Sequence, residues 1–304
     1  MLYRWAFATL IVLAPTVTAN ATDPVRVVAS FTILANMTEQ VAGERAEVSS
    51  LVGPDGDAHV FEPTPDHARR VVQADLIVRN GLGFEGWMDR LLDATDGNAL
   101  TVRATAGIKP LSGDDHHGHH HHDGHHHGDE DPHAWLDVDR ARLYVRNIRD
   151  GLMEADPQHA DHYEAGAEAY LEELATLDTH IREELAAIPE ERRQVMTSHA
   201  AFAYFEDAYG IRFHAPRGIT TGDEPAASDV AHLVRELREK RIAALLPDNL
   251  SDDRLLRRMA SEADMDIAGT LYSDALSPAD GPAPTYSAMM RHNASMLVEA
   301  LREE

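Results

Sequence analysis

Three histidines in this sequence sit where metal-binding groups are usually found. His59 follows a turn, His133 follows Pro132, and His199 follows a predicted strand. Asp274 ends the last predicted strand and offers a carboxylate oxygen. Open α/β sheets place their binding groups at the carboxyl ends of strands. Three imidazoles and one carboxylate are the ligands of a tetrahedral zinc site, so these side chains predict one, with two ligands from each half of the chain.

Each of these residues, taken alone, has an ordinary structural interpretation as a side chain at the end of a strand. The prediction rests on their combination and on a second feature, the segment 114–131. This segment is almost entirely His, Gly, Asp and Glu, has no large apolar side chain to bury, and is predicted to be a mobile loop. Its histidines, which could bind additional zinc weakly or could form a passive solvated insertion, are His116, His117, His119, His120, His121, His122, His125, His126 and His127.

Acidic residues near the histidines could orient the imidazole rings by hydrogen bonding, as carboxylates commonly do around bound metals. Glu62, Asp131 and Asp137 are the nearest in sequence. Asp248 follows another predicted strand and could either contact the site or cap a helix.

Short β-rich runs alternate with helical patterns along the chain, which predicts an α/β fold of two similar lobes, each a mostly parallel sheet covered by helices. Apolar residues at helical spacing between the lobes predict one long rigid helix that joins them, beginning at Asp156-Pro157 with Asp156 as its N-cap. Asp66 is a second predicted N-cap, and Ile267–Leu271 is the last predicted strand. The predicted divisions are a signal peptide at 1–21, an N-terminal lobe at 22–155, the linking helix at 156–188 and a C-terminal lobe at 189–304.

The first 21 residues have the form of a cleavable signal peptide: Arg4, an apolar stretch too short to span a bilayer, and the small-x-small sequence Ala19-Asn20-Ala21. Export predicts a periplasmic protein that is not embedded in the membrane. The chain has no cysteine, which excludes disulfides and a lipid anchor on an N-terminal cysteine. Its 52 acidic against 27 basic residues give a net charge of −25, which repels nucleic acid.

Several segments resemble the metal-specific solute-binding proteins of bacterial ABC transporters, a family also called cluster A-I or cluster 9. The matching segments are GPDGDAHVFEPTPD (53–66), NGLGFEGW (80–87), DPHAWLD (131–137), TSHAAFAYF (197–205) and LYSDALS (271–277). The resemblance implies two α/β lobes joined by one long helix, with His59, His133, His199 and Asp274 at the ligand positions.

The same resemblance implies a function. Histidine at the third ligand position and an acidic His-rich loop are similar to the zinc-binding members, and the sequence looks closest to the AztC-type proteins. We therefore expect a monomer that captures one periplasmic zinc ion and delivers it to a permease with its ATPase, with a zinc chaperone as a possible further partner. Alternatives are a zinc buffer or metallochaperone that acts through the His-rich loop and, least favoured, a zinc hydrolase. The hydrolase is disfavoured because the sequence has neither a His-Glu-x-x-His helix nor a Gly-x-Ser-x-Gly elbow.

Overall fold

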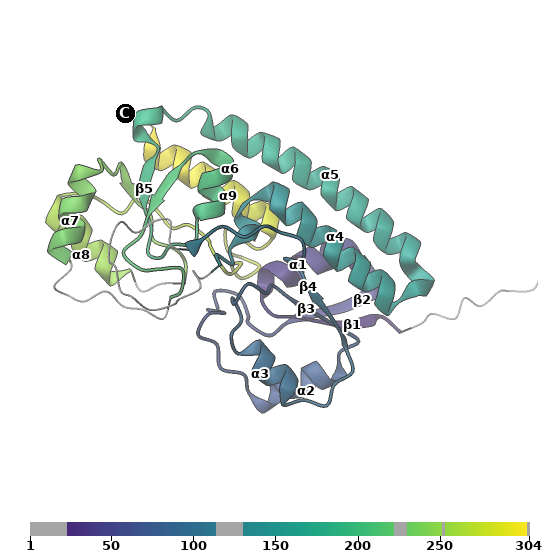
Figure 1. Cartoon of the computed structure of the whole chain (residues 1–304). Helices are drawn as coiled ribbons and strands as arrows, with labels where there is room; N and C mark the ends of the chain where they lie inside the picture. Colours follow the sequence, from purple (N-terminus) through teal and green to yellow (C-terminus); the bar gives the residue numbers. More distant parts are fainter. Residues whose placement is uncertain (1–22, 114–129, 222–229, 251–252, 303–304) are drawn as a thin grey trace, which may run out of the picture.

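The computed structural model describes residues 23–113, 130–221, 230–250 and 253–302. Two parallel sheets and their covering helices make up this part of the chain (Figure 1). The first lobe contains β1 (Val25–Ala29), α1 (Thr32–Ala42), β2 (Ala46–Ser50), α2 (Pro65–Gln73), β3 (Leu76–Arg79), α3 (Met88–Asp93), β4 (Leu100–Arg103) and α4 (Val138–Ala155). After the long helix α5 (Ala160–Leu185), the second lobe contains β5 (Gln194–Met196), α6 (Ala203–Tyr209), β6 (Arg212–His214), α7 (Val230–Glu239), β7 (Ala244–Leu245), α8 (Arg254–Ala263) and α9 (Tyr286–Leu301).

The first sheet has the strand order β2-β1-β3-β4, and all of its described pairs are parallel. Parallel strands need helical crossovers, and α1 and α2 supply them between successive strands. Helices cover both faces of this sheet, with α1 and α4 on one side and α2 and α3 on the other (Figure 1). The predicted α/β fold is therefore confirmed. The carboxyl ends of the parallel strands face the second lobe (Figure 1).

The second sheet is smaller, with the order β6-β5-β7, again parallel. The strand predicted at Ile267–Leu271 is wrong as a continuous strand, because this segment makes only isolated parallel bridges, Ile267 to Leu245 and Leu271 to Asp248. Pro247 lies between the two bridges and has no N–H to donate to a ladder, which keeps β7 short. The segment still delivers its last residues, up to Asp274, to the end of the sheet.

Helix α5 runs along both lobes and packs on α1 and α4 at one end and on α9 at the other (Figure 1). Its 26 residues make it about 39 Å long at 1.5 Å per residue. Asp156 is the N-cap residue of a 3-10 turn, Pro157–His159, that leads directly into α5, as predicted, although its side chain makes no capping hydrogen bond. The helix differs from the prediction in that its first turn is a 3-10 turn, and the Asp156 carboxylate bonds the His159 ring.

One hydrophobic core extends from the first lobe through α5 into α6 and α9, so the lobes share buried side chains. A smaller cluster packs α7 and α8 against the second sheet. Helix α2 begins two residues earlier than predicted, because Thr64 rather than Asp66 is its N-cap, in a reciprocal pair with the His67 ring. No helix among the described residues is long and apolar enough to span a bilayer.

Candidate metal centre

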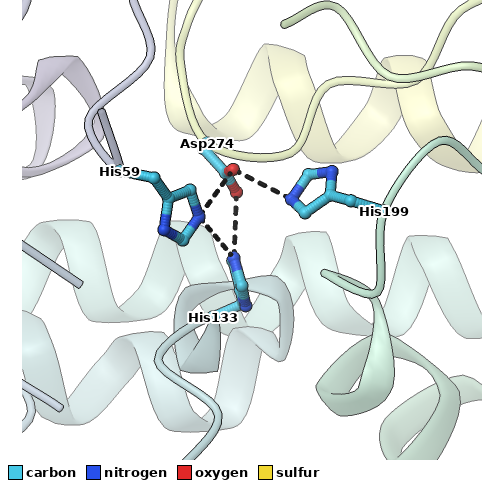
Figure 2. Close-up of side chains that lie close together, drawn as sticks. All are labelled: His59, His133, His199 and Asp274. Carbon is cyan, nitrogen blue, oxygen red and sulfur yellow. Dashed lines mark hydrogen bonds and ion pairs between the residues drawn. The ribbon is translucent and has the colours of Figure 1, made fainter. Parts of the chain in front are cut away.

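Four side chains that are far apart in sequence meet between the lobes. His59, His133, His199 and Asp274 each direct a ligand atom to one point, and these atoms all lie within 4.8 Å of one another (Figure 2). The His59 side chain is 4% exposed and Asp274 is fully buried. Among the described residues, no other group of His, Cys, Asp or Glu meets the same criterion. The structure thus brings together all four ligand candidates predicted for the zinc site.

The spacing of the ligand atoms suits a small divalent cation. Nε2 of His59 lies 3.3 Å from Nε2 of His133 and 3.4 Å from an oxygen of Asp274. The other ring contacts with Asp274 are 3.1 Å from His199 Nε2 and 3.5 Å from His133 Nε2. Two ligands bound about 2.0–2.1 Å from a tetrahedral ion lie about 3.3 Å apart. Four of the six ligand pairs are therefore spaced close to the edge length of a tetrahedral coordination shell.

His59 and His133 are held by the same local pattern, Asp-x-His. A carboxylate oxygen of Asp57 accepts the His59 backbone N–H at 2.8 Å, and one of Asp131 accepts the His133 N–H at 2.9 Å. Aspartate side chains commonly accept the N–H two residues further on, which forms a tight Asx turn. Asp131 also bonds Nδ1 of His133 at 2.8 Å, so Nδ1 carries the proton and Nε2 is left free to bind a metal.

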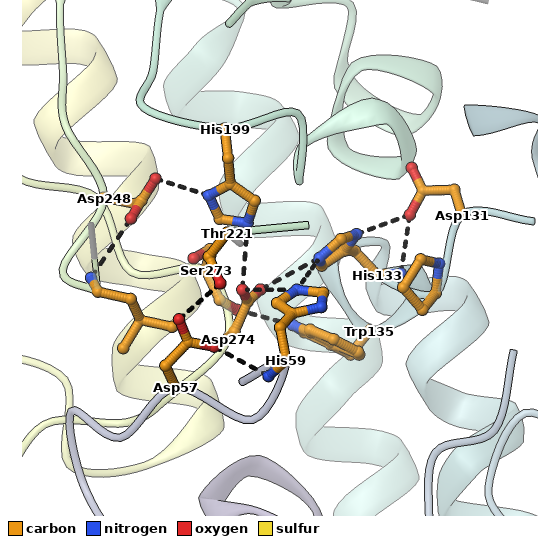
Figure 3. A network of polar contacts seen from close by, with 12 residues as sticks. Asp57, His59, Asp131, His133, Trp135, His199, Thr221, Asp248, Ser273 and Asp274 are labelled. Atoms are coloured by element: carbon orange, nitrogen blue, oxygen red, sulfur yellow. Dashed lines mark hydrogen bonds and ion pairs between the residues drawn. The ribbon is translucent and has the colours of Figure 1, made fainter. Parts of the chain in front are cut away.

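His199 is oriented in an equivalent way from the second lobe. Its Nδ1 lies 2.8 Å from Asp248, and both side chains are fully buried (Figure 3). This contact directs Nε2 of His199 toward Asp274. One oxygen of Asp274, Oδ1, is buried and has no hydrogen-bond partner within the described part of the chain. Because a buried polar atom without a partner is costly, this oxygen suits coordination of a cation.

The pKa values of the His199 and His59 rings are shifted in opposite directions. Burial opposes the charge of His199, but Asp248 and Asp274 outweigh it and raise the pKa of His199 well above its usual value. Burial lowers the pKa of His59, and the neighbouring His133 and His199 add to that effect. Burial also opposes ionisation of Asp274, yet His133 and His199 outweigh it and hold the pKa of Asp274 well below its usual range. Both shifts favour an ionised Asp274 beside a protonated His199 in the metal-free site.

Aromatic side chains pack beside the histidine rings of the site. Phe84 packs edge-on against His59 with the ring centroids 4.7 Å apart, and it also contacts Trp135 at 4.9 Å. A turn with three consecutive positive φ angles, Gly81 to Gly83, places Phe84 there. The buried carboxylate of Glu85 fixes this turn by accepting the Asn80 N–H at 2.6 Å and the Gly81 N–H at 3.1 Å.

Only some of the acidic residues that were predicted to orient the imidazole rings contact them. Asp131 and Asp248 contact the rings as described, whereas Glu62 is exposed and Asp137 faces away from them. Asp137 is the N-cap of α4, where it accepts the Asp139 N–H and pairs with Arg140 at 2.7 Å. These two predictions failed because closeness in sequence does not fix the direction of a side chain. The predicted His-rich loop, 114–131, falls almost entirely outside the described residues.

Sequence reasoning missed Asp57, Phe84 and Trp135 as parts of the site. The repeated Asp-x-His spacing could have identified Asp57, because it matches that of Asp131 and His133. The Trp135 indole donates to the Ser273 carbonyl in the other lobe at 2.8 Å, a contact that no local pattern indicates.

Comparisons with known proteins identify the family of this chain. The family described as zinc-uptake complex component A, periplasmic, matches residues 27–300. The chain is 33% identical over 287 residues to the manganese-binding lipoprotein MntA of Halalkalibacterium halodurans, covering 94% of this chain and 91% of that protein. It is 33% identical over 288 residues to the iron-binding protein YfeA of Yersinia pestis, covering 94% and 90%.

Among solved structures, the periplasmic zinc binding protein TroA of Treponema pallidum superposes with a TM-score of 0.83 at 26% identity, covering 93% of this chain and 100% of TroA. The family consists of substrate-binding proteins rather than enzymes, so the expectation of no catalytic activity is confirmed. The proteins similar to this chain are named for manganese, iron or zinc, so membership alone does not select the metal. The chain belongs to this family of periplasmic metal-binding components of ABC transporters.

Proposed function

We propose that the protein binds one zinc ion through His59, His133, His199 and Asp274 and delivers it to the permease of an ABC transporter for import. The observation that carries the proposal is the donor set: three imidazole nitrogens and one carboxylate oxygen within 4.8 Å of one another. Imidazole suits zinc, whereas manganese favours oxygen ligands. The buried carboxylates on Nδ1 of His133 and His199 support this choice, since they leave the Nε2 atoms free to coordinate.

Direct metal analysis tests the identity of the cargo. Protein purified from its native periplasm without added metal is expected to contain one zinc per chain, and competition titrations then give its zinc and manganese affinities. His199→Glu replaces a nitrogen ligand by oxygen, and we expect it to lower the ratio of zinc to manganese affinity by at least about tenfold. Stoichiometric manganese or iron in the native protein would overturn zinc as the cargo. Tight zinc binding by His59→Ala would overturn the site itself.

Delivery is tested in cells. A strain that lacks the protein is expected to grow poorly when zinc is chelated, and the unaltered protein should restore growth whereas His59→Ala should not. Rescue of the deletion strain by manganese instead of zinc would contradict the proposal. We also propose that the chain acts as a monomer after cleavage behind Ala21, which mass measurement of the secreted protein tests directly. The proposed lobe boundaries, 22–155 and 189–304 about the helix 156–188, are testable by limited proteolysis.

A secondary proposal concerns the segment 114–131, whose nine histidines could gather zinc weakly and pass it to the nearby His133. Only composition supports it. A Gly/Ser linker in place of the segment is expected to lower the number of bound zinc ions and to slow loading, including loading from a zinc chaperone. An unchanged stoichiometry together with unchanged loading kinetics would exclude this role.

A further inference from the structure

The loop Gly53–Ala58 of the first lobe reaches across to the second lobe directly beside the metal site. Three of its hydrogen bonds cross between the lobes: Asp57 with Thr221, Asp55 with Asn249, and the Asp55 N–H with Leu276. None of these residues is a ligand candidate. Each crossing contact nevertheless involves a residue close in sequence to a ligand or to a residue that holds one.

The Asp57 carboxylate makes two contacts with different roles. One oxygen accepts the His59 N–H at 2.8 Å, which orients the ligand loop. The other accepts the Thr221 hydroxyl at 2.6 Å, which ties that loop to the second lobe (Figure 3). Both side chains are partly buried, which strengthens a hydrogen bond to a carboxylate. One side chain therefore couples the position of His59 to the position of the other lobe.

Asp55 makes the matching contacts on the side of Asp274. Its N–H donates to the carbonyl of Leu276 at 3.0 Å, two residues beyond Asp274. Its carboxylate accepts the side-chain N–H of Asn249 at 3.1 Å, and Asn249 follows Asp248, the residue that holds His199. The loop thus contacts the second lobe near both of that lobe's ligands.

The loop is stiff enough to transmit these contacts. Pro54 fixes one backbone angle, and the Gly56 N–H closes a turn on the Gly53 carbonyl at 3.1 Å. Asp55 adopts a positive φ of 52°, and a Cβ on Gly56 would lie 2.7 Å from the Val52 side chain. Few alternative conformations are therefore open to this loop, so breaking its contacts requires it to move as a unit.

We infer that the loop Gly53–Ala58 is a clasp whose hydrogen bond from Thr221 to Asp57 sets the rate at which the bound metal leaves. The His59 side chain is 4% exposed and the side chains of the other candidate ligands are fully buried, so a bound ion cannot leave unless these residues move. Release requires His59 to withdraw, and Asp57 holds the His59 backbone in place only while it is itself held by Thr221. Asp57 and Thr221 are positioning residues, because neither touches the metal. The inference rests on the proposed metal site.

The rate of zinc dissociation tests the clasp. Zinc-loaded protein is mixed with excess chelator in a stopped-flow instrument, and association is measured separately. Thr221→Val keeps the shape of the side chain but loses the hydroxyl, and we expect dissociation to accelerate about tenfold, equivalent to about 1.4 kcal/mol. The association rate should stay within about twofold, because the ligands are unchanged. Thr221→Ser retains the hydroxyl and should restore slow release.

Two further variants separate the clasp from a general structural effect. Thr220→Val alters the neighbouring exposed threonine and should leave release unchanged. Asp57→Ala should accelerate release more than Thr221→Val, and adding Thr221→Val to it should have no further effect, since the shared hydrogen bond is already lost. Unchanged release in Thr221→Val, or equal acceleration in Thr220→Val, would overturn the clasp. Tight zinc binding in His59→Ala would overturn the underlying site instead, so the two failures are distinguishable.

Discussion

The indole nitrogen of Trp135 donates a hydrogen bond of 2.8 Å to the carbonyl oxygen of Ser273. Trp135 lies two residues after His133, and Ser273 immediately precedes Asp274, so this contact joins one ligand from each lobe beneath the site (Figure 3). Both residues are fully buried. Trp135 therefore connects the segment of the first lobe that carries His133 to the segment of the second lobe that carries Asp274.

Replacing Trp135 by phenylalanine tests this link. Trp135→Phe keeps an aromatic ring against Phe84 but leaves the Ser273 carbonyl without its donor, which costs about 1–3 kcal/mol when the carbonyl is buried. We expect lower unfolding stability and zinc affinity reduced about tenfold. Calorimetry and competition titration measure the two effects. Loss of stability with wild-type affinity would show that the bond supports the fold without positioning Asp274.

The Asp248 carboxylate should matter to metal affinity although it is not a ligand. Asp248→Ala frees Nδ1 of His199, so the ring can rotate or adopt the other tautomer, and we expect zinc affinity to fall about 10–100-fold. Competition titration with a zinc-responsive dye checks the value. Glu62→Ala is the matched control: this acidic residue is near His59 in sequence but exposed, and its removal should leave affinity unchanged. Equal losses in both variants would point to net charge rather than ring orientation.

As the pH is lowered, zinc affinity should begin to fall at a higher pH than it would if every histidine of the site had the ordinary pKa of 6.5. The pKa of His199 is raised well above 6.5, so its proton competes with zinc below that raised value and is lost as the pH rises through it. The pKa of His59 is lowered, so His59 competes only at more acidic pH. Affinity is thus expected to increase with pH across neutrality and to level off above the raised pKa of His199. Affinity that is flat from pH 6 to pH 8 would contradict a protonated His199 in the metal-free site.

The contact of α5 with α1 should tolerate no added side-chain atom. A Cβ on Gly166 would lie 2.3 Å from the carbonyl oxygen of Val41, so Gly166→Ala must displace one helix. Overpacking of this kind costs about 1–3 kcal/mol, more than alanine gains over glycine in a helix. Chemical denaturation should show the loss. Gly86→Ala, whose Cβ would meet nothing within 4 Å, is expected to be nearly neutral.

The candidate ligands of the second lobe, His199 and Asp274, could be predicted from the sequence because each follows a segment that pairs in the second sheet, whereas His59 and His133 lie in loops. His199 follows β5, and Asp274 follows a segment that pairs with the end of the same sheet even though it is too irregular to form a strand. Parallel sheets bring such ends together, whatever the details of their strands. The predictions for the α/β fold and the joining helix were confirmed for the same reason.

Contacts between distant segments could not be predicted. Trp135 and Ser273 are 138 residues apart, and Asp57 and Thr221 are 164 apart, so no periodicity or spacing relates them. The failures at Glu62 and Asp137 are the converse case, in which residues near a ligand in sequence point elsewhere because a helix N-terminus or solvent offers a better partner. The start of α2 was misplaced at Asp66 because Thr64, two residues earlier, is the N-cap residue.

Helix α5 is continuous along both lobes, and this limits how far the lobes can move relative to each other when metal binds. A flexible hinge would let two lobes swing apart, whereas a shared helix and a shared core allow only small sliding movements between packed side chains. We therefore expect the outer surface of the protein to differ little between its empty and its loaded state. A permease that accepts only loaded protein would then have to recognise small differences in the loops that carry the candidate ligands.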